Sequence, residues 1–214
     1  MIDGLPGRNP DLIIRHAGKR NQHHGIAEEK LEHFARGIYR CRKCRLHKER
    51  RHAVPGEGDP GCRIVLVGEA PGAVEDRTAR PFMGPAGKFL DRLLADHDIR
   101  RQDLFLTSCV KCRPPGNRNP KDDEIECCVT NWLQPQLDVI EPEIVVLAGL
   151  VAARQFLGGS PVMAEVHGTE HRRHGRLYFV TYHPAAGMRF PAAAKAMHAD
   201  FEKLSGKIRG RKQQ

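Results

Sequence analysis

Four of the seven cysteines in this chain are spaced like the ligands of a metal ion or an iron–sulfur cluster. Cys41 and Cys44 form a C-x2-C pair in a polar, basic loop, while Cys112 and Cys128 lie on either side of a proline-rich loop and a helical pattern. Four thiolates from two distant segments can close one tetrahedral site or hold one cubane, so the spacing leaves zinc and iron–sulfur both open. The remaining cysteines, which suit buried apolar positions better, are Cys62, Cys109 and Cys127.

Disulfide bonds are a poor explanation for these cysteines. Their number is odd, and residues 1–20 contain no apolar stretch of the kind that a secretory signal needs. No segment approaches the ~20 consecutive apolar residues of a membrane span. We therefore expect a cytoplasmic protein without membrane contact, associated with the nucleoid of a prokaryote, where thiols stay reduced.

The chain is strongly basic. Its 214 residues carry a formal net charge of +9 at pH 7, and basic residues concentrate between Arg40 and Arg51 and again after Glu202. Such a surface attracts a polyanion through phosphate contacts and counterion release, although it can also be a solvated surface without a binding role. We expect nucleic acid as the partner. A metal or cluster would fix four basic residues beside the path of that partner: Arg42, Lys43, Arg45 and Lys111.

Apolar runs and helical periods alternate along the chain. Short runs dense in Val, Ile and Leu predict buried strands at residues 63–68, 103–109, 143–149 and 177–183. Helical periods predict helices at residues 27–39, 86–96, 121–137 and 150–157. Buried strands that alternate with helices are typical of a parallel sheet covered on both faces. The expected fold is α/β, a three-layer α/β/α sandwich with a central four-stranded parallel sheet.

We expect one folded domain, at residues 26–204, which is long enough to bury a substantial core. Residues 1–25 are rich in Gly, Pro, Asn, His and basic residues, and we interpret them as a flexible basic N-terminal extension. Residues 205–214 are interpreted as a basic C-terminal tail.

Three of the predicted strands are followed by loops of unusual composition. These loops are residues 69–72 (EAPG), 111–115 (KCRPP) and 183–185 (HPA). In open parallel sheets, ligands bind outside the carboxyl ends of the strands, so we expect the active site at this edge. The chain has neither a Walker A motif nor G-x-G-x-x-G, which argues against the use of nucleoside triphosphates or dinucleotides.

The motifs in these loops resemble those of the family 4 uracil-DNA glycosylases. The first comprises residues 67–72 (VGEAPG), then Glu75-Asp76, then residues 80–87 (RPFMGPAG). The second is residues 111–118 (KCRPPGNR) and the last is residues 181–185 (TYHPA). The resemblance covers residues 30–204. It implies a base-excision repair enzyme that flips a damaged base, uracil or another deaminated base, out of DNA and hydrolyses its N-glycosidic bond.

The resemblance also implies a cofactor. The cysteines that hold a [4Fe-4S] cluster in the family correspond to Cys41, Cys44, Cys112 and Cys128 of this sequence. Such a cluster would tie the N-terminal helix to the loop after the second strand. Its expected role is structural and not catalytic.

By resemblance, the loop residues acquire roles in breaking the glycosidic bond. Phe82 would stack on the flipped base, and His183 would donate a hydrogen bond to O2 of the leaving uracil. Glu69 and Glu75 would line the site, where one of them orients water or stabilises the sugar cation. The backbone would approach the base closely at Gly68, Ala70 and Gly72, which lack bulky side chains.

Two further expectations concern selectivity and DNA contact. Ser108 departs from the family, which usually has Asn at this position, and one hydroxyl cannot make the same two-point contact with uracil. We therefore expect a site that is less selective for uracil or less active on it. Met188 is expected to insert as a wedge into the duplex, with Arg189 on a phosphate.

Three functions stay open on the sequence. The first is a monomeric, monofunctional uracil-DNA glycosylase without strand cleavage, because the site loops hold no obvious lysine nucleophile. The second is a non-catalytic DNA-binding module of the same fold that recognises damage or ends, which Ser108 and the basic chain ends favour. The third is an iron–sulfur redox protein or a zinc protein that uses the fold for another purpose.

Overall fold

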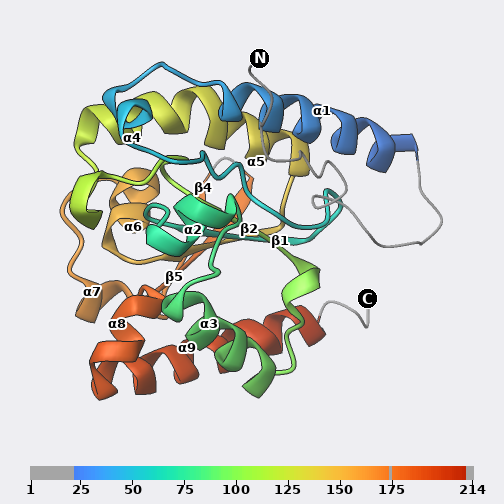
Figure 1. Cartoon of the computed structure of the whole chain (residues 1–214). Helices are drawn as coiled ribbons and strands as arrows, with labels where there is room; N and C mark the ends of the chain where they lie inside the picture. The colour runs from blue at the N-terminus through green and yellow to red at the C-terminus, as the bar shows by residue number, and fades with distance from the viewer. Residues whose placement is uncertain (1–21, 174, 211–214) are drawn as a thin grey trace, which may run out of the picture.

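The structure is a computed structural model that describes residues 22–173 and 175–210 (Figure 1). Within this part, one five-stranded sheet has the order β2-β1-β3-β5-β4. The strands are β1 (Ile64–Gly68), β2 (Leu104–Ser108), β3 (Ile144–Ala148), β4 (Glu170–Arg173) and β5 (Arg176–Thr181). β1, β2, β3 and β5 run parallel to one another, which confirms the predicted α/β fold and its four parallel strands.

β4 is an additional edge strand that the sequence patterns did not predict. It runs antiparallel to β5, from Glu170 opposite Phe179 to Arg173 opposite Arg176. Its sequence, EHRR, contains no apolar residue and most of it is exposed. Charged side chains suit an edge strand because they discourage pairing with other chains, but they also remove the apolar signal on which strand prediction depends.

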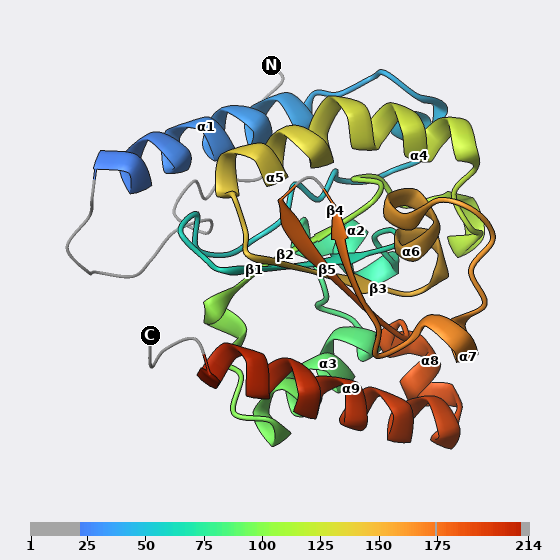
Figure 2. The same ribbon diagram turned by 180° about the vertical axis from the view of Figure 1, so that it is seen from behind.

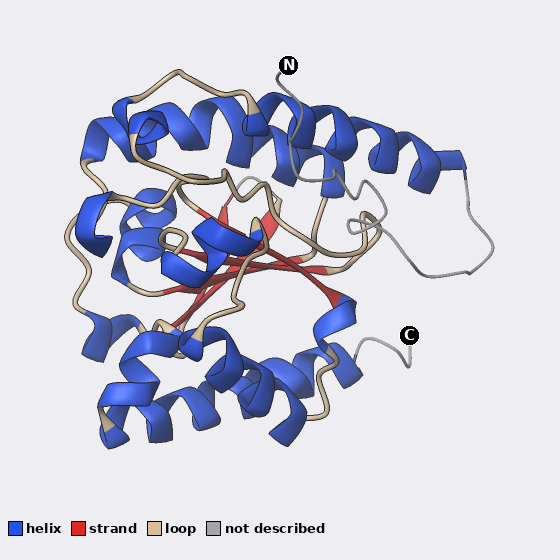
Figure 3. Ribbon diagram, viewed as in Figure 1, coloured by secondary structure: helices blue, strands red, loops and turns tan. Residues whose placement is uncertain are grey.

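Helices cover both faces of the sheet and complete the predicted three-layer sandwich (Figure 3). The α-helices are α1 (Gln22–Tyr39), α2 (Ala73–Thr78), α3 (Pro85–Asp96), α4 (Asp122–Cys128), α5 (Gln134–Ile140), α6 (Leu150–Leu157), α7 (Met163–Val166), α8 (Pro184–Arg189) and α9 (Pro191–Gly210). Short 3₁₀ turns occur at η2 (Arg45–Lys48), η3 (Arg101–Asp103) and η4 (Pro115–Asn117). Among the described helices, none has the length and apolar character to cross a membrane.

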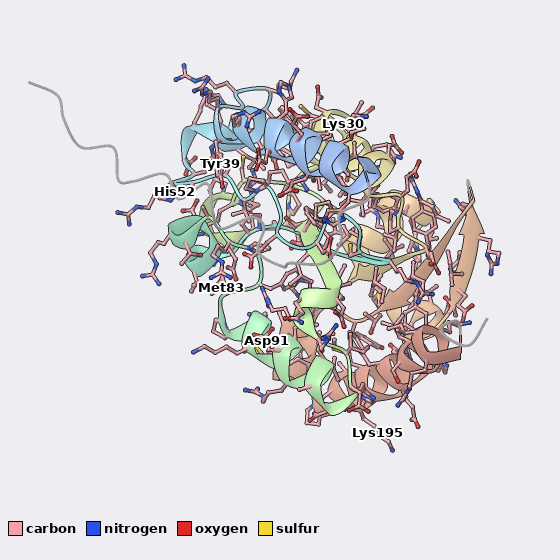
Figure 4. The ribbon with its side chains drawn as sticks, turned by 90° about the vertical axis from the view of Figure 1, so that its right-hand side faces the viewer. Lys30, Tyr39, His52, Met83, Asp91 and Lys195 are labelled. Atoms are coloured by element: carbon pink, nitrogen blue, oxygen red, sulfur yellow. The ribbon has the colours of Figure 1, made fainter. Side chains whose placement is uncertain are left out.

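The two helical layers lie on opposite sides of the sheet. Figure 2 shows α1, α4 and α5 above the sheet and α3 and α9 below it. In Figure 4, Lys30 on α1 and Lys195 on α9 lie at opposite sides of the molecule. Each layer therefore encloses its own half of the core.

The alternation of side chains along the strands supplies both halves of the core. In β1, Val65 and Val67 belong to the cluster that includes α1 and α5, while Ile64 and Leu66 belong to the cluster that includes α3 and α9. Successive residues of a strand point to opposite faces, so a strand buried on both faces must be apolar at every position. This is why the four parallel strands were predictable as continuous apolar runs.

The helix predicted at residues 121–137 is two α-helices joined by a π-helical turn. The turn spans Val129–Leu133, and Pro135 lies in the first turn of α5. Proline has no amide hydrogen and its ring crowds the preceding turn, so the backbone widens there. Cys128, just before the turn, and Trp132, within it, both line one cavity.

The last helix, α9, was not predicted although its sequence carries a helical period. Ala193, Met197, Phe201 and Leu204 are buried and recur at intervals of three or four residues. Met197, Phe201 and Leu204 pack on the sheet face opposite α1 and close the second half of the core.

The chain ends differ from the expected boundaries. α9 continues to Gly210, so residues 205–210 are helical and not a tail, and Ser205 is buried. α1 begins at Gln22, inside the expected N-terminal extension. The rest of the extension and of the tail, residues 1–21 and 211–214, lies outside the described residues.

Candidate active site

The parallel register brings the loops after the strands to one edge of the sheet. Gly68 at the end of β1 lies opposite Ser108 at the end of β2, and Ala148 lies opposite Thr181 at the end of β5. The residues that follow these ends carry the candidate side chains. The loops are also tied to each other, because Val110 N donates to Glu69 O at 3.2 Å.

Gly68, Phe82 and His183 meet at this edge and form what we call the Phe82–His183 cluster. A Cβ atom at Gly68 would lie 2.8 Å from Phe82 Cζ and 3.6 Å from His183 Nε2. The two rings are nearly parallel, with centroids 6.2 Å apart and an interplanar angle of 30°. Residues separated by more than one hundred positions are thus adjacent, and any side chain at Gly68 would fill the space between them.

The carboxylate of Glu75 is saturated by backbone amides. Its Oε1 accepts from Met83 N at 2.9 Å and from Gly84 N at 2.7 Å, and its Oε2 accepts from Gly72 N at 3.0 Å. Glu75 therefore joins the loop after β1 to the loop that carries Phe82; the position of Met83 in that loop is visible in Figure 4. The structure brings Glu75 to the site, but as a residue that positions Phe82.

The Phe82 loop has a constrained backbone. Phe82 itself has φ +54°, a left-handed conformation that costs roughly 1 kcal/mol or more for a non-glycine residue. Gly87 packs against it so closely that a Cβ there would lie 1.7 Å from Phe82 O. Arg101, which sequence reasoning missed, donates to Pro81 O at 2.8 Å and pairs with Asp91 at 2.7 Å. These contacts fix the orientation of the aromatic ring.

Glu69 differs from Glu75 in having a free carboxylate. Among the described residues, no donor makes a hydrogen bond or an ion pair to its side chain, and burial raises its pKa above the usual value. Its neighbour Ala70 is half-buried in the same loop. Glu69 is thus the carboxylate at this edge that can accept a hydrogen bond from water or substrate.

His183 caps the N-terminus of α8 and has a defined tautomer. Its Nδ1 accepts from Ala185 N at 3.1 Å, so in the neutral ring the proton is assigned to Nε2, the atom near Gly68. Burial lowers the pKa of His183 to about 4, against an opposing pull from Glu75. Gly149, with φ +98°, allows the ring to approach, because a Cβ there would lie 2.9 Å from His183 Cβ.

Ser108 is buried and its hydroxyl proton is committed. Ser108 Oγ donates to Val110 O at 2.7 Å, and the Ser108 carbonyl accepts from Lys111 Nζ at 3.0 Å. A hydroxyl that already donates can offer only its lone pairs to a further partner.

The loop after His183 exposes apolar side chains. Met188 is 46% exposed and is followed by the exposed Arg189, at the end of α8. Phe190 comes next and is 61% exposed, more than any other large apolar residue of the described chain. Sequence reasoning missed Phe190, although a large aromatic residue between Arg189 and Pro191 was a usable signal.

The four predicted ligand cysteines converge on one cavity, which we call the cysteine cavity. Its lining comprises Ile38, Cys41, Lys43, Cys44, His47, Arg50, Lys111, Cys112, Cys127, Cys128 and Trp132. The described residues contain no group of three or more His, Cys, Asp or Glu side chains that could hold a metal ion directly. The four thiols surround one common space.

Hydrogen-bond donors point at three of these sulfurs. Arg50 donates to Cys112 Sγ at 2.8 Å, Trp132 Nε1 to Cys41 Sγ at 3.3 Å, and the Lys111 amide to Cys128 Sγ at 3.2 Å. Such donors stabilise thiolate sulfur, the form in which cysteine binds metals. The donor set therefore suits an electron-rich thiolate cluster.

The remaining cysteines only partly follow the prediction. Cys62 and Cys109 are buried as expected. Cys127 is half-exposed and lines the cysteine cavity, so its predicted role as a buried apolar residue is wrong. Cys127 and Cys128 are consecutive in α4, and both line the cavity.

Comparisons with known proteins identify the family of this chain. A model of the "Uracil DNA glycosylase superfamily" matches residues 55–204. The chain is similar to a type-4 uracil-DNA glycosylase of Archaeoglobus fulgidus, with 39% identity over 86% of this chain and 96% of the relative. It is also similar to a type-4 enzyme of Thermotoga maritima (39% identity, 74% and 83% covered) and a type-5 enzyme of Thermus thermophilus (35%, 61% and 68%). The chain therefore belongs to the uracil DNA glycosylase superfamily.

Proposed function

We propose that this protein is a monofunctional uracil-DNA glycosylase, which hydrolyses the bond between a uracil base and deoxyribose C1′ in DNA. The observation that carries the proposal is the meeting of Gly68, Phe82 and His183 at the carboxyl edge of the sheet. An aromatic face for stacking and an N–H donor for the base lie side by side there. The names of the similar type-4 enzymes supply the substrate.

His183 stabilises the leaving base in this proposal. When the glycosidic bond breaks, the base departs with negative charge that is shared by its carbonyl oxygens. His183 is neutral at physiological pH because its pKa is about 4, and its proton is on Nε2. The neutral ring can therefore donate a hydrogen bond from Nε2–H to the developing anion.

Glu69 acts on the sugar and on the attacking water in this proposal. As C1′ becomes electron-poor, a free carboxylate can stabilise positive charge and orient the attacking water, whose proton it accepts. Glu75 cannot do this as well, because three backbone amides already occupy its oxygens. We assign Glu69 to the water and Glu75 to the positioning of Phe82.

DNA is held by the exposed surface around the site. Met188 and Phe190 present apolar side chains that can fill the gap left by an extruded base, and Arg189 can contact a phosphate. Gly68, and with it Ala70, leaves room for the flipped base beside Phe82 and His183, whereas the amide of Gly72 is already bonded to Glu75. Ser108 offers an acceptor. The net charge of +9 favours a polyanionic substrate.

A [4Fe-4S] cluster fits the cysteine cavity, with Cys41, Cys44, Cys112 and Cys128 as its ligands. The fit rests on the four thiols around one space and on the three donors that point at their sulfurs. When bound, the cluster supplies a covalent cross-link between the end of α1 and the loop after β2. No step at the glycosidic bond passes through it.

Incubation with a uracil-containing oligonucleotide, followed by alkali, tests the function. We expect cleavage at uracil and none at thymine in a matched oligonucleotide. Glu69→Gln should lower the rate strongly, while Glu165→Gln, on the exposed surface of α7, serves as the matched control. Failure of the protein to release uracil, hypoxanthine or xanthine would remove the proposal. The monomeric state and the association with a nucleoid stay predictions.

A further inference from the structure

Lys111 was expected beside DNA, but it is 1% exposed and among the largest fully buried side chains. Its Nζ donates to Thr107 Oγ1 and to Ser108 O, both on β2. Among the described residues, no Asp or Glu forms an ion pair with it. Lys111 is therefore a buried cation with only neutral hydrogen-bond partners, and it is not on the path of DNA.

A buried cation without an anion is unfavourable. Two neutral acceptors replace only part of the hydration that an ammonium group loses on burial, and a buried charge is normally paired or bound to a ligand of opposite sign. The next residue in the chain is Cys112, a proposed cluster ligand, whose thiol would be an anionic thiolate when it binds iron.

Lys111 also lines the cysteine cavity, and its backbone amide donates to Cys128 Sγ. A cluster held by four thiolates carries net negative charge, and its stability and potential depend on nearby charges and on hydrogen bonds to sulfur. Arg50 supplies positive charge from the half-exposed side of the cavity, where water weakens it. Lys111 lies on the buried side of the cavity, with its Nζ bonded to Thr107 and Ser108.

We propose that Lys111 is the buried positive partner of the iron–sulfur cluster, held in place by Thr107 and the Ser108 carbonyl. This inference rests on the cluster in the proposed function. It makes Lys111 a positioning and charge-compensating residue, without contact to the reacting bond.

The test compares the full-length wild-type protein with Lys111→Met and Lys111→Arg, all purified without oxygen. Iron and sulfide per chain are measured first, and then the rate at which a chelator bleaches the visible absorbance. We expect Lys111→Met to lose its cluster about 10–100-fold faster, the range found for partners of metal ligands. Its cluster should also have a more negative reduction potential, and Lys111→Arg should lie close to the wild type.

Lys43→Met is the matched control, because it removes the same charge from an exposed position on the same cavity. We expect a small effect from it, since water screens Lys43. The proposal is overturned if the Met and Arg variants behave alike. This holds whether both keep the cluster or both fail to fold, because the charge of Lys111 would then not be the property that matters. A wild-type protein without iron would instead remove the cluster itself.

Discussion

The Ser108 hydroxyl has one oxygen at the candidate site, and its proton is already used in a hydrogen bond to Val110 O. The free lone pairs can accept from the N3–H group of uracil, whereas the N3 atom of cytosine has no proton to give. One such hydrogen bond is worth about 1 kcal/mol, or roughly a fivefold change in kcat/KM. If Ser108 contacts the base as proposed, we expect it to discriminate uracil less strongly than an amide would.

We expect Ser108→Asn to raise kcat/KM on uracil by roughly five- to tenfold, because an amide adds a second contact. Ser108→Ala should lower it by a similar factor. Single-turnover rates on uracil and on mismatched cytosine measure both effects. An unchanged or slower Asn variant that melts at the wild-type temperature would show that position 108 does not read the base.

The pH dependence of activity should report Glu69 and not His183. Burial raises the pKa of Glu69, and the charged form is the active one, so kcat/KM is full above this pKa and falls as pH drops through it. The pKa of His183 is about 4, so the neutral donor persists at every pH above that value.

We therefore expect an acid limb above the usual pKa of Glu, which Glu69→Gln abolishes while lowering kcat by roughly 10²–10⁴. The measurement is kcat/KM between pH 4 and pH 8 at constant ionic strength. A limb near the ordinary pKa of histidine that disappears in His183→Asn would contradict the assignment.

At the scale of elements, the Phe82 loop depends on a single carboxylate. Glu75→Gln replaces an acceptor of three amides by a group that has one oxygen and a donor. We expect a loss of roughly 2 kcal/mol in the free energy of unfolding and a fall in Tm of roughly 4–8 °C. Thermal unfolding with and without single-stranded uracil-DNA checks this, and Glu165→Gln again serves as the control. A Glu75→Gln variant with the wild-type Tm but a reduced kcat would instead indicate that Glu75 takes part in the reaction.

The secondary-structure elements differ in how well their sequences predicted them. The four parallel strands are apolar along most of their length because both faces are buried, so their sequences were sufficient. β4 is charged because it is an edge, and its partner β5 decides its conformation. The π-helical turn before Pro135 depends on packing against α1 and the sheet, which no local pattern encodes.

The candidate site was predictable in its members and not in their roles. Motifs named Phe82, His183 and both carboxylates, and parallel topology placed them at one edge. The division of labour between Glu69 and Glu75 depends on which amides reach which oxygen. The burial of Lys111 depends on a loop conformation, so a basic residue was mistaken for a surface one.

At the scale of the molecule, the cluster should act as a cross-link. Cys44 and Cys112 are 112 − 44 = 68 residues apart, and closing a loop of this length is worth about 4 kcal/mol. We expect Cys112→Ser to lose most of its iron and to unfold roughly 8–16 °C lower. Cys62→Ser, a buried thiol outside the cavity lining, should keep its iron. Iron analysis measures the cluster content of both variants, and calorimetry measures their unfolding temperatures. Equal iron in both variants would exclude Cys112 as a ligand.

The packing of α1 against α5 also has a consequence for biosynthesis. A ribosome finishes α1 at Tyr39, and α5 begins at Gln134, 134 − 39 = 95 residues later. At a synthesis rate of roughly 5–20 residues per second, the apolar side of α1 stays uncovered for several seconds until α5 has been made. Iron loading by all four ligands must wait until Cys128 has left the exit tunnel. A nascent chain halted before that point therefore exposes the apolar side of α1 and the free thiols of Cys41 and Cys44, which follow it, and is a natural target for chaperones and proteases.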